Sequence, residues 1–238
     1  MRVLIAAPRK SGSARLRCLL SFAYGLTSAH SRGVPNQEDI DAIEAWLGAL
    51  PESSVVSTDF NYSPEVREAC TRHAISLVAI LRHPFDLLVS TYDVAQQRAL
   101  SGKPATRDDE MQSQMVGKSL DDPVVLDYAR NEFTGEVASL TGWHESGVPV
   151  IRFEQIEADP AAALADLAAY LGVVDNANIA RAVALCPAGN PVHGRPERGR
   201  RMEALPPGAW QERLPEITLD VLRERFTADV RRLGYEVS

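Results

Sequence analysis

The sequence is poor in cysteine and has no long apolar run. Its three cysteines, Cys18, Cys70 and Cys186, lie far apart at spacings that fit neither a metal site nor a redox motif, so we expect no disulfide framework. No apolar run approaches the roughly 20 residues that a membrane-spanning helix needs. The first residues also lack the basic segment and apolar stretch of a signal peptide. We therefore predict a cytoplasmic protein with no membrane partner.

Positive charge is in deficit overall. The formal net charge is −7 and the isoelectric point is near 5.3. A broad nucleic-acid interface needs a basic face, so this balance argues against a nucleic-acid partner while leaving room for a local anion pocket. The 238 residues, 45% of them hydrophobic and 24% charged, have the composition of an ordinary globular chain. We predict one domain spanning residues 1–238.

Lysine is the rarer basic residue, because only three of the 25 Lys and Arg residues are lysines. One of them, Lys10, lies in a short polar loop, Arg9–Ser13, between an apolar run at 3–7 and apolar residues at helical spacing from Leu16 to Ala23. This order predicts a strand, a tight loop and a helix. Since a helix N-terminus attracts anions, the loop predicts an anion site, and a solvated loop lysine is the alternative.

Short apolar segments alternate with amphipathic ones along much of the chain. Buried strands are predicted at 3–7, 55–58, 74–81 and 148–153, and helices at 39–50, 84–100, 159–171 and 218–233. The alternation predicts an α/β fold of three layers, with a mainly parallel central sheet flanked by helices. In such sheets, ligands bind beyond the carboxyl ends of the strands.

A second candidate phosphate site follows the predicted strand at 74–81. Arg82 comes directly after this strand, and Ser90 lies about two turns into the helix that Pro84 opens. A guanidinium group can fork around a phosphate and a hydroxyl can donate one more hydrogen bond. The alternative is structural: Arg82 pairs with Asp86, and Ser90 bonds back to its own helix.

Two segments lack a clear period. Residues 101–122 hold two of the three lysines, and residues 187–208 are rich in Pro, Gly and Arg. Both are predicted to be substrate or cofactor loops, with 101–122 and 121–133 forming part of an acceptor wall. In the second segment, four arginines crowd seven residues: Arg195, Arg198, Arg200 and Arg201.

These motifs together resemble the sulfotransferases that use 3′-phosphoadenosine 5′-phosphosulfate (PAPS). Lys10-Ser11-Gly12-Ser13 is similar to the family's Lys-Ser-Gly-Thr loop, and Arg82-His83-Pro84-Phe85-Asp86 with Ser90 is similar to its 3′-phosphate motif. Further resemblances follow in family order along nearly the whole chain: Arg152–Ile156, Asp159-Pro160, Tyr170–Gly172, Arg198-Gly199 and Gly208–Trp210. Residues 17–20, Arg-Cys-Leu-Leu, resemble bacterial members that sulfate antibiotic scaffolds, which implies a natural-product acceptor and secondary metabolism.

The resemblance implies a P-loop-like phosphate-binding motif and assigns the residues that bind the donor. These are Arg9, Lys10, Ser11, Gly12, Ser13, Ala14, Arg15, Arg82, Ser90, Phe153, Arg198 and Gly199. Lys10 is the implied catalyst that stabilises charge on the leaving phosphate of the product PAP, with Ser11 the preferred residue to steer it. No metal is required by this chemistry, and we assign no metal ligand.

Three departures from the family pattern bear on the chemistry. Ala14 and Arg15 stand where the family has Thr and Trp, and Phe153 keeps the ring of a family tyrosine without its hydroxyl. Asp59, in Ser57-Thr58-Asp59, stands where the family has the histidine of Lys-Thr-His, so we predict Asp59 as the general base. A turn cap with Asn61 or Ser63 is the alternative role, and His83, His144 and His193 are rival bases.

The predicted function is transfer of a sulfuryl group from PAPS to a hydroxyl of a small-molecule acceptor. One alternative is a small-molecule kinase of the P-loop class, whose G-x-x-x-x-G-K-[ST] loop places Lys after the second Gly, whereas Lys10 precedes Gly12. Another is a non-catalytic nucleotide-binding module. The sequence leaves the acceptor's identity open, and homo-oligomerisation open as well.

Overall fold

A computed structural model describes residues 1–29, 33–101, 112–188 and 205–237. The chain divides into two compact units, which are described one at a time. The first consists of Met1–Leu81 and Gly142–Arg195, and the second of Arg82–Thr141 and Pro196–Ser238.

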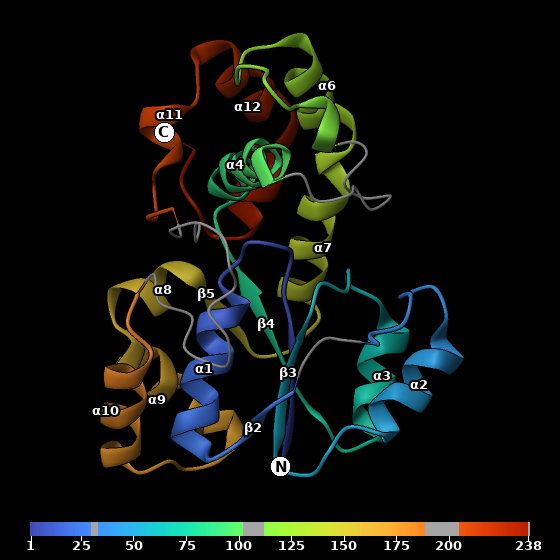
Figure 1. Ribbon diagram of the computed structural model, residues 1–238, viewed down its shortest axis with the longest axis vertical. Helices are drawn as coiled ribbons and strands as arrows, with labels where there is room; N and C mark the ends of the chain where they lie inside the picture. Colours follow the sequence, from blue (N-terminus) through green and yellow to red (C-terminus); the bar gives the residue numbers. More distant parts are fainter. Residues whose placement is uncertain (30–32, 102–111, 189–204, 238) are drawn as a thin grey trace. The chain divides into compact units, whose positions relative to one another are not determined.

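The first unit is built on a five-stranded parallel sheet (Figure 1). Its strands are β1 (Arg2–Ala6), β2 (Thr27–Ser28), β3 (Ser54–Thr58), β4 (Ser76–Leu81) and β5 (Val150–Arg152), in the order β2-β3-β1-β4-β5. The register pairs Ala6 with Thr58 on one side and with Ala79 on the other. The predicted α/β class with a parallel central sheet is confirmed.

Helices cover both faces of this sheet, giving the predicted three layers (Figure 1). One face packs against α1 (Ser13–Tyr24), α8 (Phe153–Ala158), α9 (Pro160–Leu171) and α10 (Asn176–Leu185). The other face packs against α2 (Ile40–Gly48), α3 (Pro64–Arg72) and Trp143. Alternate strand residues, such as Ile5 and Leu4, enter opposite cores because successive side chains point to opposite faces.

Some elements differ from the sequence prediction. The strand predicted at 148–153 is only three residues long, and Phe153 begins α8 instead of ending the strand. Arg152 starts this helix as its N-cap, and its backbone N–H donates to the Gln155 side chain. Local capping therefore ends the strand before the apolar pattern does.

The described part of the second unit is helical. It contains α4 (Pro84–Ser101), α6 (Pro123–Asn131), the first part of α7 (Phe133–Glu145), α11 (Trp210–Arg213) and α12 (Glu216–Arg232). Its core includes the edge-to-face pair Phe133–Phe226, and Arg213 on α11 makes two hydrogen bonds to Asp93 on α4, at 2.6 and 2.8 Å. Within the described residues of the whole chain, no helix has the length and apolar character needed to cross a bilayer.

A disulfide joins two helices of the first unit. Cys18 on α1 is bonded to Cys186, which caps the C-terminus of α10. The spacing of the cysteines indicated no disulfide framework, and this one bond corrects that expectation. The two cysteines are 168 residues apart in the sequence, so only the packing of α1 on α10 brings them together.

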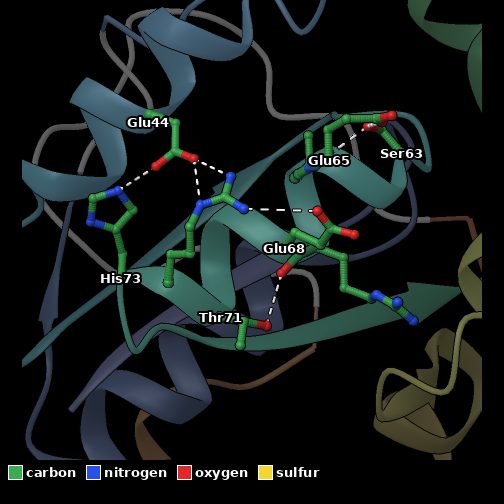
Figure 2. A network of polar contacts seen from close by, with 9 residues as sticks. Glu44, Ser63, Glu65, Glu68, Thr71 and His73 are labelled. Carbon is green, nitrogen blue, oxygen red and sulfur yellow. Dashed lines mark hydrogen bonds and ion pairs between the residues drawn. The ribbon is translucent and has the colours of Figure 1, made fainter.

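A polar network ties α2 to the C-terminal end of α3 (Figure 2). The Glu44 carboxylate lies 2.6 Å from Nε2 of His73 and accepts a hydrogen bond from Nε of Arg72 at 2.8 Å. These hydrogen bonds hold the pKa of Glu44 below its ordinary value, with the bond from Arg72 the largest cause. At the other end of α3, the Ser63 side chain caps the helix and also bonds Glu65.

Candidate functional site

A cavity of about 380 Å³ lies where β1 and β3 end. The chain leaves β1 through α1 on one face of the sheet, and it leaves β3 through α3 on the other face. Adjacent parallel strands whose connections part in this way form a topological switch point, where open α/β sheets bind ligands. The cavity is lined by Ala7, Pro8, Arg9, Ser13, Val34, Ser57, Thr58 and Asp59.

The loop after β1 has a backbone shape that favours an anion. Lys10 is exposed and has a φ of 71°, which is uncommon for a residue other than glycine. The Ser11 hydroxyl donates to the Pro8 carbonyl and the Ser11 N–H bonds to the same oxygen, closing the loop on itself. Ser11 is fully buried, and its oxygen lone pairs are left to accept a bond, so its steering of Lys10 stays a prediction.

Gly12 has no room for a side chain. Its φ is 90°, and a Cβ at this position would come within 2.4 Å of a ring carbon of Phe153. Phe153 is 1% exposed and starts α8, so a buried ring of this helix packs against the loop at Gly12. The resemblance places Phe153 near adenine, and the structure places it against Gly12.

The N-terminus of α1 carries the wrong side chains for an isolated helix. Gly12 is its N-cap with no side-chain cap, and its first turn holds no acidic residue. Arg15 lies in that turn and Arg17 at the start of the next one, although the positive end of a helix dipole disfavours cations. A bound anion would complement the uncapped N–H groups at this helix end.

Arg9, which follows β1, forms an ion pair with Asp59, which follows β3. Nε of Arg9 lies 2.7 Å from Oδ2 of Asp59. Both side chains are close to half exposed and both line the cavity. The alternative role for Asp59 as a turn cap is not observed, because Asn61 bonds Gln37 through its N–H and Ser63 caps α3.

Arg15 points to α8. Its guanidinium forms an ion pair with Glu157, and both side chains are mostly buried. Ala14, the residue before it, is exposed. The stacking or phosphate contact predicted for Arg15 is untested, since the structure shows only how the protein itself holds this side chain.

Two residues that line the cavity, Ser57 and Thr58, and Arg17, which bonds Ser57, were missed as site residues in the sequence. Arg17 donates from Nη1 to Oγ of Ser57 at 3.2 Å, and Thr58 is 5% exposed with no hydrogen-bond partner for Oγ1 among the described residues. Arg17 follows Ser13 by four residues, a spacing that puts both on one helix face. That spacing was the only signal for Arg17 in the sequence. Its closeness to Ser57 on β3 arises only from the packing of α1 on the sheet.

In the second unit, Arg82 is 1% exposed and donates from Nη2 to the Leu205 carbonyl at 2.9 Å. Asp86 is fully buried and accepts hydrogen bonds from the N–H groups of Gly208 and Trp210, at 2.7 and 3.0 Å. The Arg-x-Pro-x-Asp and Gly-x-Trp motifs are thus physically joined. Ser90 is 4% exposed on α4, and its predicted contact with a phosphate stays a prediction.

The rival bases differ in their surroundings. Both ring nitrogens of His83 are engaged: Nδ1 accepts from the Phe85 N–H, and Nε2 donates to the Glu236 carbonyl. The ring also stacks on Trp210, so His83 has a structural role. His144 is half-buried, with Nδ1 lacking a hydrogen-bond partner in the described structure. His193, Arg198 and Gly199 lie outside the described residues.

Two other features of the first unit lie away from this loop. A larger cavity, about 600 Å³, opens between α3 and the segment before β5, at the amino ends of β4 and β5. It holds none of the predicted site residues. Among the described residues, no group of three or more His, Cys, Asp or Glu side chains is arranged to hold a metal ion.

Comparison with solved structures finds sulfotransferases. A mouse sulfotransferase, SULT7A1, complexed with PAP has a TM-score of 0.66 at 14% identity, over 98% of this chain and 88% of its own. A retinol dehydratase in complex with androsterone and inactive cofactor PAP has a TM-score of 0.55 at 14% identity, and the match covers 97% of this chain and 82% of that one. A sulfotransferase domain from the curacin biosynthetic pathway has a TM-score of 0.50 at 14% identity, and the match covers 100% of this chain and 98% of that one. No protein-family model and no curated protein sequence matches the chain. The chain therefore has the sulfotransferase fold.

Proposed function

We propose that the protein transfers a sulfuryl group from PAPS to a hydroxyl of a small-molecule acceptor. The observation that carries the proposal is the cavity between β1 and β3, which collects Arg9, Ser13 and Asp59 beside the Lys10 loop. The fold supports it, because two of the solved structures that resemble it, a sulfotransferase and a retinol dehydratase, contain PAP, the product that PAPS leaves.

The residues of the loop fit the phosphosulfate end of the donor, which supplies the group to be transferred. Gly12 lets the Phe153 ring pack directly against the loop, the uncapped start of α1 offers N–H groups, and Lys10 brings a flexible positive charge. As the bond to the leaving phosphate breaks, Lys10 stabilises the negative charge that develops there.

Asp59 is the proposed general base. It accepts the proton of the acceptor hydroxyl while the hydroxyl oxygen forms its bond to sulfur. Its ion-pair partner Arg9 lines the same cavity. In the proposed mechanism, Arg9 turns to the donor's anionic oxygens and thereby releases Asp59 to act as the base. Arg82 and Ser90 are proposed to bind the 3′-phosphate, a role that rests on the resemblance of their motif.

The donor is tested by calorimetry with adenosine 3′,5′-bisphosphate and, separately, with ATP and Mg²⁺. We expect the bisphosphate to bind and the triphosphate to bind weakly. Binding of the triphosphate alone would favour the kinase alternative, and the position of Lys10 before Gly12 argues against that outcome.

Catalysis is tested by single-turnover sulfuryl transfer with PAPS and a panel of hydroxyl acceptors. Lys10→Ala and Asp59→Asn are each expected to lower the rate by a factor on the order of 10²–10⁴ while PAP still binds. An unchanged rate for Asp59→Asn removes it from the mechanism. Bisphosphate binding without turnover in the unaltered protein would point to a non-catalytic module.

The proposed setting is secondary metabolism in the cytoplasm, and the biosynthetic sulfotransferase domain among the structural matches supports the first part. The Cys18–Cys186 disulfide bears on the second part, because disulfides persist mainly in oxidising compartments. Mass spectrometry of protein alkylated inside cells shows whether the bond exists there.

A further inference from the structure

His83 follows Arg82 directly and caps the N-terminus of α4. Its carbonyl accepts the N–H of Leu87 at 3.0 Å, and its Nδ1 accepts the N–H of Phe85 at 3.1 Å. A side chain that bonds the second residue of a helix satisfies an N–H group that the helix itself leaves unpaired. The cap therefore fixes the backbone where α4 begins, one residue after Arg82.

The other ring nitrogen of His83 reaches the C-terminal part of the chain. Nε2 lies 2.8 Å from the backbone carbonyl oxygen of Glu236, which can only accept a hydrogen bond. Because the Phe85 N–H can only donate, the two contacts together require a neutral ring with its proton on Nε2. Tyr235 packs edge-on against the same ring, with the ring centroids 5.1 Å apart. His83 thus joins the start of α4 to residues 153 positions further along the chain.

The way α12 ends holds this C-terminal segment in a defined conformation. The N–H groups of Gly234 and Tyr235 donate to carbonyls in the last turn of α12, at 2.9 and 3.0 Å. These two bonds form a Schellman motif, in which Gly234 has a φ of 74°. Further along, Nε of Arg223 on α12 donates to the Val237 carbonyl at 3.4 Å. The segment therefore meets His83 as an ordered part of the second unit.

The same ring also supports the segment that holds the Arg82 side chain. Trp210 stacks on His83, with centroids 5.1 Å apart and ring planes inclined by 20°. Asp86 on α4 accepts the N–H of Trp210 at 3.0 Å, which ties this tryptophan to the helix that His83 caps. Five residues before Trp210, the Leu205 carbonyl accepts the bond from Nη2 of Arg82 at 2.9 Å. His83 is therefore in contact with both the backbone and the segment that place Arg82.

We propose that His83 is a positioning residue for donor binding, which links the C-terminal residues 235–237 to Arg82 and sets the direction of the Arg82 guanidinium toward the 3′-phosphate. This inference rests on the proposed function, in which Arg82 binds that phosphate. A guanidinium recognises a phosphate through N–H groups in a fixed geometry, so its direction has to be held by the residues around it. His83 acts through its neighbours and makes no contact with the donor itself.

The test measures how strongly the protein prefers adenosine 3′,5′-bisphosphate over adenosine 5′-phosphate, as the ratio of their dissociation constants from competition calorimetry. The two ligands differ only in the 3′-phosphate, so the ratio reports the contacts to that group. A general weakening of the nucleotide site affects both ligands and cancels in the ratio. We expect Arg82→Gln to lower the preference by about 10- to 100-fold and His83→Ala to lower it by about 10-fold.

Further variants separate the contacts of His83. His83→Asn keeps an acceptor for the Phe85 N–H, because asparagine is a good helix cap, but it loses the bond to the Glu236 carbonyl. Deletion of residues 235–238 removes the same bond from the other side. Each change should lower the preference several-fold, and the deletion should add little to His83→Asn, because both remove one shared contact. Glu236→Gln is the matched control, since it alters an exposed side chain and keeps the carbonyl that His83 meets.

The outcomes separate this inference from the proposed function. If the preference depends on Arg82 but is unchanged in the His83 variants and in the deletion, the inference is wrong and the proposed function stands. Equal weakening of both nucleotides by His83→Ala and His83→Asn would show that His83 only maintains the fold, which overturns the inference as well. No preference for the bisphosphate in the unaltered protein would instead contradict the proposed donor, and a preference that ignores Arg82→Gln would remove the 3′-phosphate from Arg82.

Discussion

At the scale of single residues, Gly12 is the position in the Lys10 loop whose space and backbone conformation both disfavour a side chain. Gly12 combines a φ of 90° with a ring of Phe153 where a Cβ would lie. Either condition alone disfavours a side chain, and together they explain why the loop holds glycine at its junction with α1. The loop thus depends on a residue of α8 that is distant in sequence.

Replacing Gly12 by alanine should cost about 2–4 kcal/mol of unfolding free energy, from left-handed backbone strain and from displacement of the buried Phe153 ring. Gly147→Ala is the matched control, because Gly147 has a φ of 76° with no atom within 4 Å of the added Cβ. Comparing the free energies of unfolding of the two variants in urea separates the cost of backbone strain from the cost of displacing the Phe153 ring. Equal costs for the two would show that the Phe153 contact is unimportant.

The sequence predicted some of these residues and could not predict others. Lys10, Gly12 and Asp59 stand out because each follows a strand, where parallel sheets bind ligands. The partners of Arg9, Arg15 and Arg17 depend on tertiary packing, because Asp59, Glu157 and Ser57 are each at least 40 residues away along the chain.

At the scale of elements, the buried strands were predictable because a parallel strand covered on both faces reads as a continuous apolar run. The two-residue strand β2 has no such run, and α3 has too few apolar residues to show a clear period. The boundary between β5 and α8 depends on a helix cap at Arg152 that apolar periodicity does not record.

The contact between α2 and α3 should depend on pH through Glu44. Its pKa is lowered in the folded state, so its contribution to stability is present above its ordinary value of 4.5 and is lost as pH falls through the lowered value. Glu44→Gln should therefore lower the urea midpoint at pH 7 and lose its effect well below pH 4.5. Asp166→Asn, which alters an exposed acid in the interior of α9, is the control.

A constant effect of Glu44→Gln across this range would contradict the assignment. So would an equal effect of Asp166→Asn, since Asp166 lies in the interior of α9, away from its N-terminal turn. The comparison thereby tests the network of Figure 2 itself.

At the scale of the whole molecule, the chain leaves the first unit after Leu81 and returns to it at Gly142. The Cys18–Cys186 bond encloses this excursion, because both cysteines belong to the first unit on either side of it. A cross-link over so long a loop restricts the unfolded chain, and the restriction lowers its conformational entropy. The sequence could not disclose the pairing, since the spacing matches no motif and the contact exists only when α10 packs on α1.

Reduction of this disulfide should lower the free energy of unfolding by about 2–4 kcal/mol. The measurement is urea unfolding of the unaltered protein with and without a phosphine reductant, beside a variant carrying both Cys18→Ala and Cys186→Ala. The variant should match the reduced protein to within its small packing losses and should not respond to reductant. Cys70 does not complicate the comparison, because burial raises the pKa of its thiol to about 12 and leaves little thiolate to exchange. An unaltered protein whose stability ignores the reductant, after mass spectrometry has verified complete reduction, would show that α1 and α10 hold together without the bond.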